Sequence, residues 1–181
     1  MNLSSVQWGA VGIQLIGFIA MGLGIGSYQA KHRTTILIIQ STAGVLWGLQ
    51  FFLLASPAGL INNVIALARN VLYAQKEKHA WARSLLLPAC FILLVIAAGC
   101  YTFTKEGAVG LLPTVAMLIQ TVAYYITNER IIRILALFVS PLWLIYDALA
   151  GSSAGVLCEA LTMISIVIAL FRYHGQGKKA A

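Results

Sequence analysis

Apolar positions fill seven stretches of the chain, and each stretch is long enough to form a membrane-spanning helix. About 20 predominantly apolar residues cross the hydrocarbon core of a bilayer. Short polar or charged segments separate the stretches, such as Ser56-Pro57 and the linker 76–83. The pattern predicts helices over 6–28, 34–55, 57–75, 84–103, 108–127, 131–149 and 154–173. The predicted fold class is therefore all-α, a polytopic membrane protein with seven transmembrane helices.

Composition supports this interpretation and sets the number of domains. Hydrophobic residues make up 60% of the 181 residues and charged residues 9%, whereas soluble domains carry about 25% charged residues. Seven spans leave no room for a soluble domain, so we expect one membrane domain over 1–181 with the lipid bilayer as its partner. The first span has no basic segment before it and is longer than a signal-peptide core, so we expect it to be retained.

The net charge of +7 resembles a nucleic-acid signal, but its distribution indicates membrane topology. Basic residues gather in alternate connections, and only Lys105 lies on the other side. Cytoplasmic loops carry an excess of Lys and Arg, so we expect the N-terminus outside and the C-terminus in the cytoplasm. No basic face large enough for nucleic acid can form. The residues assigned to the cytoplasmic side are Lys31, Arg33, Lys76, Lys78, Arg83, Arg130, Arg133, Arg172, Lys178 and Lys179.

A short pattern recurs at an offset of 96 residues. Trp47, Ser56 and Gly59 have counterparts in Trp143, Ser152 and Gly155. The offset predicts two parallel three-helix repeats, repeat A over about 6–75 and repeat B over about 108–173. A linker helix over about 84–103 would join them in a 3+1+3 arrangement, as in SWEET transporters.

Helix 57–75 carries a polar stripe formed by Asn62, Asn63, Arg69 and Asn70. Polar groups inside a bilayer face other helices or water. One interpretation is a path for a solute, and the other is hydrogen bonding between helices. Arg69 either faces the protein interior or extends to the cytoplasmic surface.

Helix 154–173 carries Glu159 on one face with Gly155 and Thr162. Glu159 could accept a proton or a cation, or pair with Arg69. Asp147 lies near the outer end of helix 131–149 and is either interfacial or interior. We expect Arg69, Asp147 and Glu159 to be the only buried charged residues.

Two tryptophans, Trp47 and Trp143, occupy equivalent repeat positions. They could cap a central pocket, because ligand sites often use aromatic side chains. The alternative is packing at the membrane interface.

Catalytic motifs are missing from the sequence: it has no HExxH, G-x-S-x-G, P-loop or GxGxxG pattern. The histidines lie outside the predicted spans, and the three cysteines fall in apolar segments, where small buried hydrophobes are expected. We therefore predict no catalytic residues, no metal and no cofactor, and the protein is not expected to be an enzyme.

Three segments resemble the YgjV-type family of bacterial inner-membrane proteins. They are LLASPAGLINNVIALARNVL (53–72), GLLPTVAMLIQTVAYY (110–125) and PLWLIYDALAGSSAGVLCEALTMISIVIALFRY (141–173). The resemblance implies a small bacterial inner-membrane protein and carries no established activity.

The layout is also loosely similar to the SWEET and PQ-loop facilitators. That group places asparagines on the third and seventh helices, whereas here the seventh offers Cys158 and Glu159. The difference favours a charged or proton-coupled solute over a neutral sugar.

These observations favour a small-solute transporter or facilitator with an unidentified solute. The residues predicted to line or support its site are Asn62, Asn63, Arg69, Asn70, Glu159, Trp47 and Trp143. The alternative is a scaffold or accessory subunit that does not transport, in which Arg69 and Glu159 form a structural pair. A homo-oligomer is compatible with both.

Overall fold

A computed structural model describes the backbone of residues 3–126 and 128–174. It describes the side chains of 10–171, apart from those at positions 77, 127 and 129. Three of the residues assigned to the cytoplasmic side, Arg172, Lys178 and Lys179, fall outside the described side chains.

The chain is all-helical over these two ranges, with no β-strand, which confirms the predicted fold class at that level. Every α-helix end lies within three residues of its predicted position. Three short 3-10 helices, η1 (Gln75–Glu77), η2 (Trp81–Arg83) and η3 (Gly107–Gly110), lie in the connections. The α-helices are α1 (Leu3–Ser27), α2 (Arg33–Leu53), α3 (Pro57–Ala74), α4 (Leu86–Glu106), α5 (Leu111–Tyr125), α6 (Glu129–Ala150) and α7 (Ser153–His174).

Five segments of the described chain are long and apolar enough to cross a membrane. Helices α4 and α5 fall within one continuous apolar segment, 86–125. Helix α3 is not among the five, because its asparagines and Arg69 lower its mean hydropathy. Large apolar side chains such as Phe52, Leu93 and Phe138 are exposed on the outer surface, as expected for contact with lipid.

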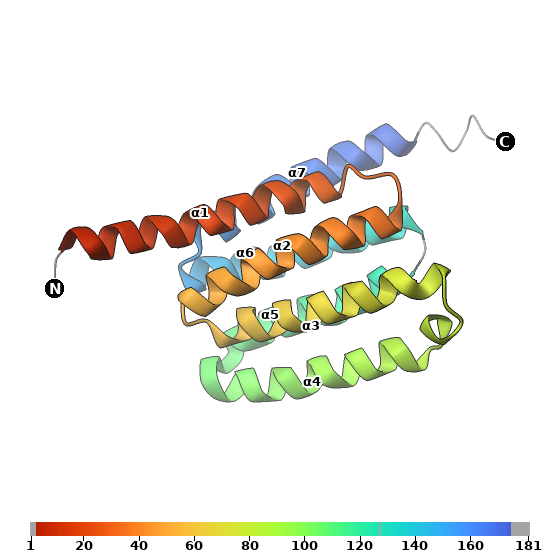
Figure 1. Cartoon of the computed structure of the whole chain (residues 1–181), viewed down its shortest axis with the longest axis horizontal. Helices are drawn as coiled ribbons and strands as arrows, with labels where there is room; N and C mark the ends of the chain where they lie inside the picture. The colour runs from red at the N-terminus through yellow and green to blue at the C-terminus, as the bar shows by residue number, and fades with distance from the viewer. Residues whose placement is uncertain (1–2, 127, 175–181) are drawn as a thin grey trace.

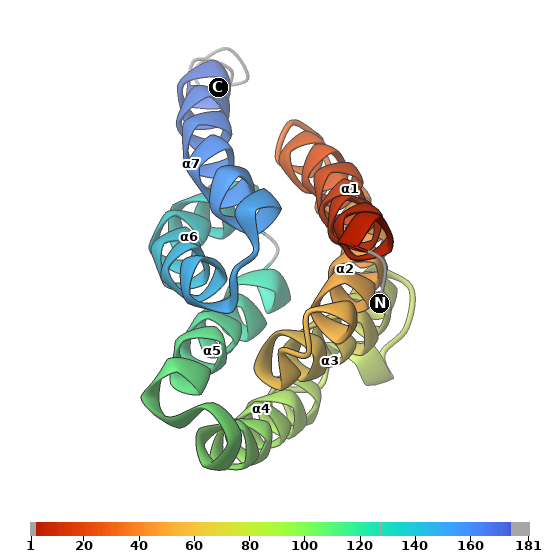
Figure 2. The same cartoon turned by 90° about the vertical axis from the view of Figure 1, so that its left-hand side faces the viewer.

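The helices lie side by side and alternate in direction along the chain (Figure 1). Each helix packs against the next in sequence, α1 also packs against α7, and α3 packs against α5. Viewed end-on, α1, α2 and α3 form one row, α5, α6 and α7 form a second row, and α4 joins the rows at one edge (Figure 2).

The connections at one end of this bundle carry the basic residues. The connections α1–α2, α3–α4 and α5–α6 lie together at that end, here called the basic end (Figure 1). The α2–α3, α4–α5 and α6–α7 connections lie at the opposite end.

The expectation that only Arg69, Asp147 and Glu159 would be buried is wrong in two respects: Glu159 is half-buried, and two basic residues at this end are buried. Arg33 is 2% exposed and Arg133 is 4% exposed. Arg133 donates to the carbonyl of Ala30 in the α1–α2 connection, and Arg33 donates to the carbonyl of Tyr124 in the last turn of α5. Carbonyls in the last turn of a helix lack partners within the helix and carry partial negative charge, which favours a cation such as Arg33.

The α2–α3 and α6–α7 turns share a backbone geometry. Ala55 and Gly151 both have positive φ, 54° and 76°. The next residue in each turn, Ser56 or Ser152, donates its N–H to a carbonyl five residues earlier, at 3.0 and 2.9 Å. This is the left-handed cap that commonly ends a helix. The two turns are 96 residues apart, the offset of the sequence pattern.

Candidate functional site

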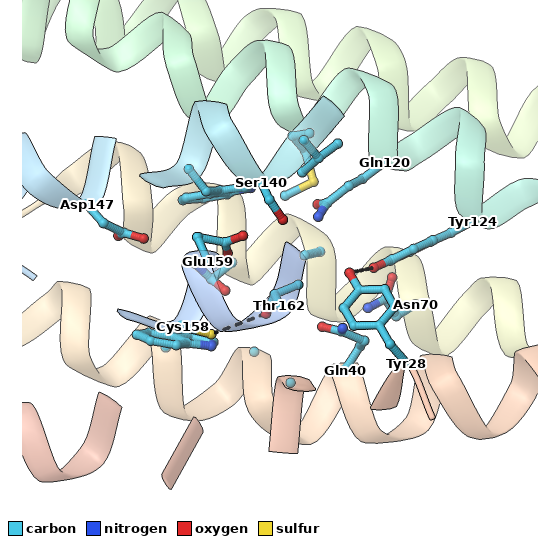
Figure 3. A pocket seen from close by; sticks show the side chains of 18 of the residues that line it. Tyr28, Gln40, Asn70, Gln120, Tyr124, Ser140, Asp147, Cys158, Glu159 and Thr162 are labelled. Atoms are coloured by element: carbon cyan, nitrogen blue, oxygen red, sulfur yellow. Dashed lines mark hydrogen bonds between the residues drawn. The ribbon is translucent and has the colours of Figure 1, made fainter. Parts of the chain in front are cut away.

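A cavity of about 90 Å³ lies between the two rows of helices. Helices α2 and α3 of one row and α5, α6 and α7 of the other contribute most of its wall, and α1 adds its last turns. Figure 3 shows polar side chains from several of these helices pointing into it. An apolar cavity of this size would stay dry, but this one is polar enough to hold a few water molecules or a small solute.

Six of the seven predicted site residues line this cavity. They are Trp47, Asn63, Arg69, Asn70, Trp143 and Glu159. Asn62 does not line it: the side chain is fully buried and donates to the carbonyl of Ala58 at 3.0 Å. Adjacent helical positions differ by about 100° in direction, so Asn62 and Asn63 face different neighbours.

The cationic group of the cavity is the guanidinium of Arg69, which is 1% exposed. It lies in the protein interior and does not extend to the surface. Nε and Nη2 donate to Oδ1 of Asn70 at 3.1 and 3.0 Å, and Nη1 donates to Met117 Sδ and Thr121 Oγ1. The guanidinium carbon also lies 4.9 Å from the centre of the Tyr124 ring. All these partners are neutral, so Arg69 and Glu159 do not form the structural pair.

Two carboxyl groups, those of Glu159 and Asp147, occupy another part of the same cavity. Asp147 is 3% exposed, which decides between the two alternatives in favour of an interior position. Its Oδ1 is buried without a hydrogen-bond partner. In Figure 3 the hydroxyl of Ser140 and the carboxyl group of Glu159 point into the same space.

Aromatic rings form one wall beside the carboxyl groups. Phe51 packs between Trp47 and Trp143 at centroid distances of 6.3 and 6.2 Å, and Tyr146 lies 5.9 Å from Trp143. Both tryptophans line the cavity, and their role in capping a bound solute stays a prediction.

Hydrogen bonds join the two rows at the basic end of the cavity. The hydroxyl groups of Tyr28 and Tyr124 lie 3.4 Å apart, and they are shown by a dashed line in Figure 3. Arg33 donates to the Tyr124 carbonyl at 2.8 Å, and Arg133 donates to the Ala30 carbonyl at 3.0 Å. Each row thus supplies one arginine to the other.

Lys76 extends this connection at the surface of the basic end. Its Nζ donates to the carbonyl of Tyr125 at 2.6 Å and lies 3.5 Å from the centre of that ring. Partial burial, and then the nearby charge of Arg33, lower the pKa of Lys76 below its usual value.

A second set of hydrogen bonds joins the rows at the opposite end. The Gly59 N–H donates to the Tyr146 hydroxyl at 2.9 Å, and the Ala154 N–H donates to Gln14 Oε1 at 3.2 Å. Glu106 at the end of α4 accepts from the Ala58 N–H at 2.9 Å and from Tyr146. The cavity therefore lies between two hydrogen-bonded ends.

Sequence reasoning missed several uncharged polar residues of the wall. Tyr28, Gln40, Gln120, Tyr124 and Ser140 line the cavity. The sequence placed Thr162 on the same helical face as Glu159, and Thr162 does line the cavity. Its Oγ1 lies 3.8 Å from Sγ of Cys158, which also lines the cavity. The 96-residue offset relates Tyr28 to Tyr124 and was the one signal that could have identified these two.

Within the described residues, no three His, Cys, Asp or Glu side chains are grouped so that they could hold a metal ion. The arrangement instead provides buried charges, hydroxyls and amides around a small space, which suits the binding of a small polar or charged molecule.

These features define a polytopic helical membrane protein with a central polar cavity. The comparison with protein families then places it: residues 11–177 match the model of Imp-YgjV, described as a bacterial inner membrane protein, and the chain belongs to this family. It is 25% identical to the inner membrane protein YgjV of Escherichia coli (strain K12) over 176 residues, which is 97% of this chain and 90% of that protein. No solved structure matches the chain.

Proposed function

We propose that this protein is a small-solute transporter or facilitator of the bacterial inner membrane and not an enzyme. The observation that supports this most strongly is the cavity between the two rows, which contains Arg69, Asp147 and Glu159 without a salt bridge among them. Buried charges are costly unless they are paired. Arg69 and Asp147 are buried and Glu159 is half-buried, and a cavity that holds all three suits the binding of a polar or charged solute.

Seven helices cross the membrane in this proposal, as two parallel three-helix units with α4 as the linker. The matching turns at Ala55 and Gly151 support the repeat, and so does the reciprocal bonding of Arg33 and Arg133 to the opposite row. The basic end faces the cytoplasm, which puts the N-terminus outside.

Alternating access then follows from the hydrogen bonds at the two ends. Opening toward the cytoplasm would separate Tyr28 from Tyr124, and opening toward the outside would separate Gly59 from Tyr146. Exchange between these states by rocking of the two units carries the solute across.

A scaffold or accessory role has less support. It needs only packed helices, and the structural pair it offered for Arg69 and Glu159 is not formed, since the hydrogen bonds of Arg69 go to neutral groups. A scaffold also gains nothing from an unpartnered carboxylate oxygen such as Asp147 Oδ1.

Cys158 provides a test that does not depend on knowing the solute. It is 4% exposed and lines the cavity, whereas Cys90 and Cys100 are exposed on the outer surface of α4. In a Cys90→Ser/Cys100→Ser background, the proposal predicts that small charged methanethiosulfonate reagents modify Cys158 from either side of oriented membrane vesicles. Modification from neither side would contradict a path through the cavity.

The matched control is Cys90 alone, in a Cys100→Ser/Cys158→Ser background. It faces lipid in this account, so charged reagents should react with it slowly from both sides.

A further inference from the structure

The solute's chemistry can be inferred from how charge is distributed in the cavity. This step depends on the proposed function, because it takes the cavity as the solute site. Arg69 carries a positive charge on α3, and Glu159 and Asp147 carry carboxyl groups on α7 and α6. No ion pair joins the two sets.

The positive end has a hydrogen-bond donor left over. A guanidinium has five N–H groups, and four hydrogen bonds to described residues are directed from Arg69 to Asn70, Met117 and Thr121. The partners hold the guanidinium in place and leave its charge unneutralised. One N–H of Nη2 remains for a ligand, and a carboxylate is the acceptor that such a group binds most strongly.

The negative end has acceptors left over. Oδ1 of Asp147 is buried without a partner, and the carboxyl group rests against the backbone of Gly155. Figure 3 shows the Asp147 carboxyl group directed toward the part of the cavity that holds Glu159. Two carboxyl groups that line one part of the cavity favour a cationic ligand there.

The positive and negative ends lie at different depths along the bundle. Arg69 is 12 residues after the start of α3 and Glu159 is 6 residues after the start of α7. The helices run in the same direction (Figure 1), so the axial offset of the two positions is about 9 Å at a rise of 1.5 Å per residue. The carboxylate and the ammonium group of one bound molecule would therefore contact different helices at different depths.

We propose that the cavity binds a small zwitterion of the amino-acid type, with its carboxylate on Arg69 and its ammonium group between Glu159 and Asp147. The volume of about 90 Å³ is smaller than the roughly 150 Å³ cavity that accepts benzene. The solute is therefore of the size of glycine, alanine or β-alanine.

The test compares whole zwitterions with their separate halves. Wild-type protein in lipid nanodiscs is titrated with glycine, L-alanine and β-alanine, with acetate, with methylamine and with neutral acetamide. At least one zwitterion should bind roughly tenfold or more tightly than acetate, methylamine and acetamide, because each half loses one charge-assisted contact.

Two variants test the negative end and the positive end of the cavity separately. Glu159→Gln should weaken zwitterion binding roughly tenfold and leave acetate unchanged, while Arg69→Met should weaken the zwitterion and leave methylamine unchanged. Lys105→Gln is the matched control: it removes an exposed charge outside the cavity and should keep zwitterion binding. Equal binding of acetamide, no binding of any zwitterion, or zwitterion binding unchanged in both cavity variants would overturn the inference.

Failure here can be told apart from failure of the transporter proposal. If Cys158 reacts from both sides but no zwitterion binds, the path stands and the solute class is wrong. If Cys158 reacts from neither side, the path itself is wrong. In the supporting outcome, the zwitterion that binds also slows Cys158 modification.

Discussion

At the scale of single residues, Asp147 depends on the absence of a side chain at Gly155. A Cβ built at Gly155 would lie 2.4 Å from Cγ of Asp147, closer than any real contact. Gly155→Ala must therefore displace the carboxyl group or separate α6 from α7, and we expect it to destabilise the protein by about 1–3 kcal/mol. Unfolding in mixed detergent micelles measures the change.

The control for that variant is Gly22→Ala, on an open face of α1 with no atom within 4 Å of the added Cβ. It should be neutral or slightly stabilising, because alanine has the higher helix propensity. Equal stability of the two variants would show that Asp147 does not rest on Gly155.

Charged residues inside apolar helices, with the asparagines near Arg69 and the two tryptophans of the offset pattern, were the part of the site that the sequence could identify. Arg69 and Glu159 stand out because ionisable groups are rare in spans, and both line the cavity. Gln40, Gln120 and Ser140 could not be identified in this way, because a neutral polar residue in a span is equally well explained by a hydrogen bond between helices. Their role as solute-binding groups stays a prediction.

At the scale of elements, the α2–α3 turn places a non-glycine residue in the left-handed region. Ala55 has a φ of 54°, which costs an L-residue with a Cβ roughly 1–2 kcal/mol. Ala55→Gly should therefore stabilise the protein by about 1 kcal/mol in the same unfolding assay.

The equivalent turn provides the opposite substitution. Gly151 has a φ of 76° and open space around it, so Gly151→Ala should destabilise by about 1 kcal/mol through backbone strain alone. A pair of variants that changed stability in the same direction would contradict the shared turn geometry.

Hydropathy predicted the helix ends well because the connections are short and polar, and each end lies within three residues of its predicted position. Hydropathy gave no sign that the side chains of Arg33 and Arg133 are buried. A basic residue at the end of a span has the same sequence pattern whether it faces water or caps another helix. Only the packing shows that Arg33 reaches the Tyr124 carbonyl in the opposite row.

At the scale of the whole molecule, the proposed orientation makes a simple prediction. The basic connections lie together at one end (Figure 1), so a reporter fused to the C-terminus should behave as cytoplasmic. C-terminal green fluorescent protein should fluoresce in bacterial cells, and C-terminal alkaline phosphatase should be inactive. The opposite pair of results would reverse the topology.

The 96-residue offset predicted two three-helix units with a site between them, and the repeat stays a prediction. The size of the cavity between the rows could not be predicted from the sequence. Its size depends on side chains from several helices, including Tyr28 and Tyr124, whose hydroxyl groups meet at the basic end. A repeat predicts equivalent positions and does not predict how much space remains between them.

The most direct test of the account is solute flux with the cavity filled. Gly44 lines the cavity and has room for a side chain, since its nearest neighbour would be Asn63 Oδ1 at 3.9 Å. Gly44→Leu should therefore fold and occupy the path, and Gly22→Leu is the matched control on the outer face of α1. Stopped-flow light scattering of proteoliposomes measures the entry of glycine, acetate, methylamine, acetamide and glycerol.

The account predicts that at least one solute enters faster with wild-type protein than in protein-free liposomes. Gly44→Leu should return that rate to the protein-free level, and Gly22→Leu should keep it. Wild-type rates equal to those of protein-free liposomes for every solute, or full flux through Gly44→Leu, would contradict a solute path through the central cavity.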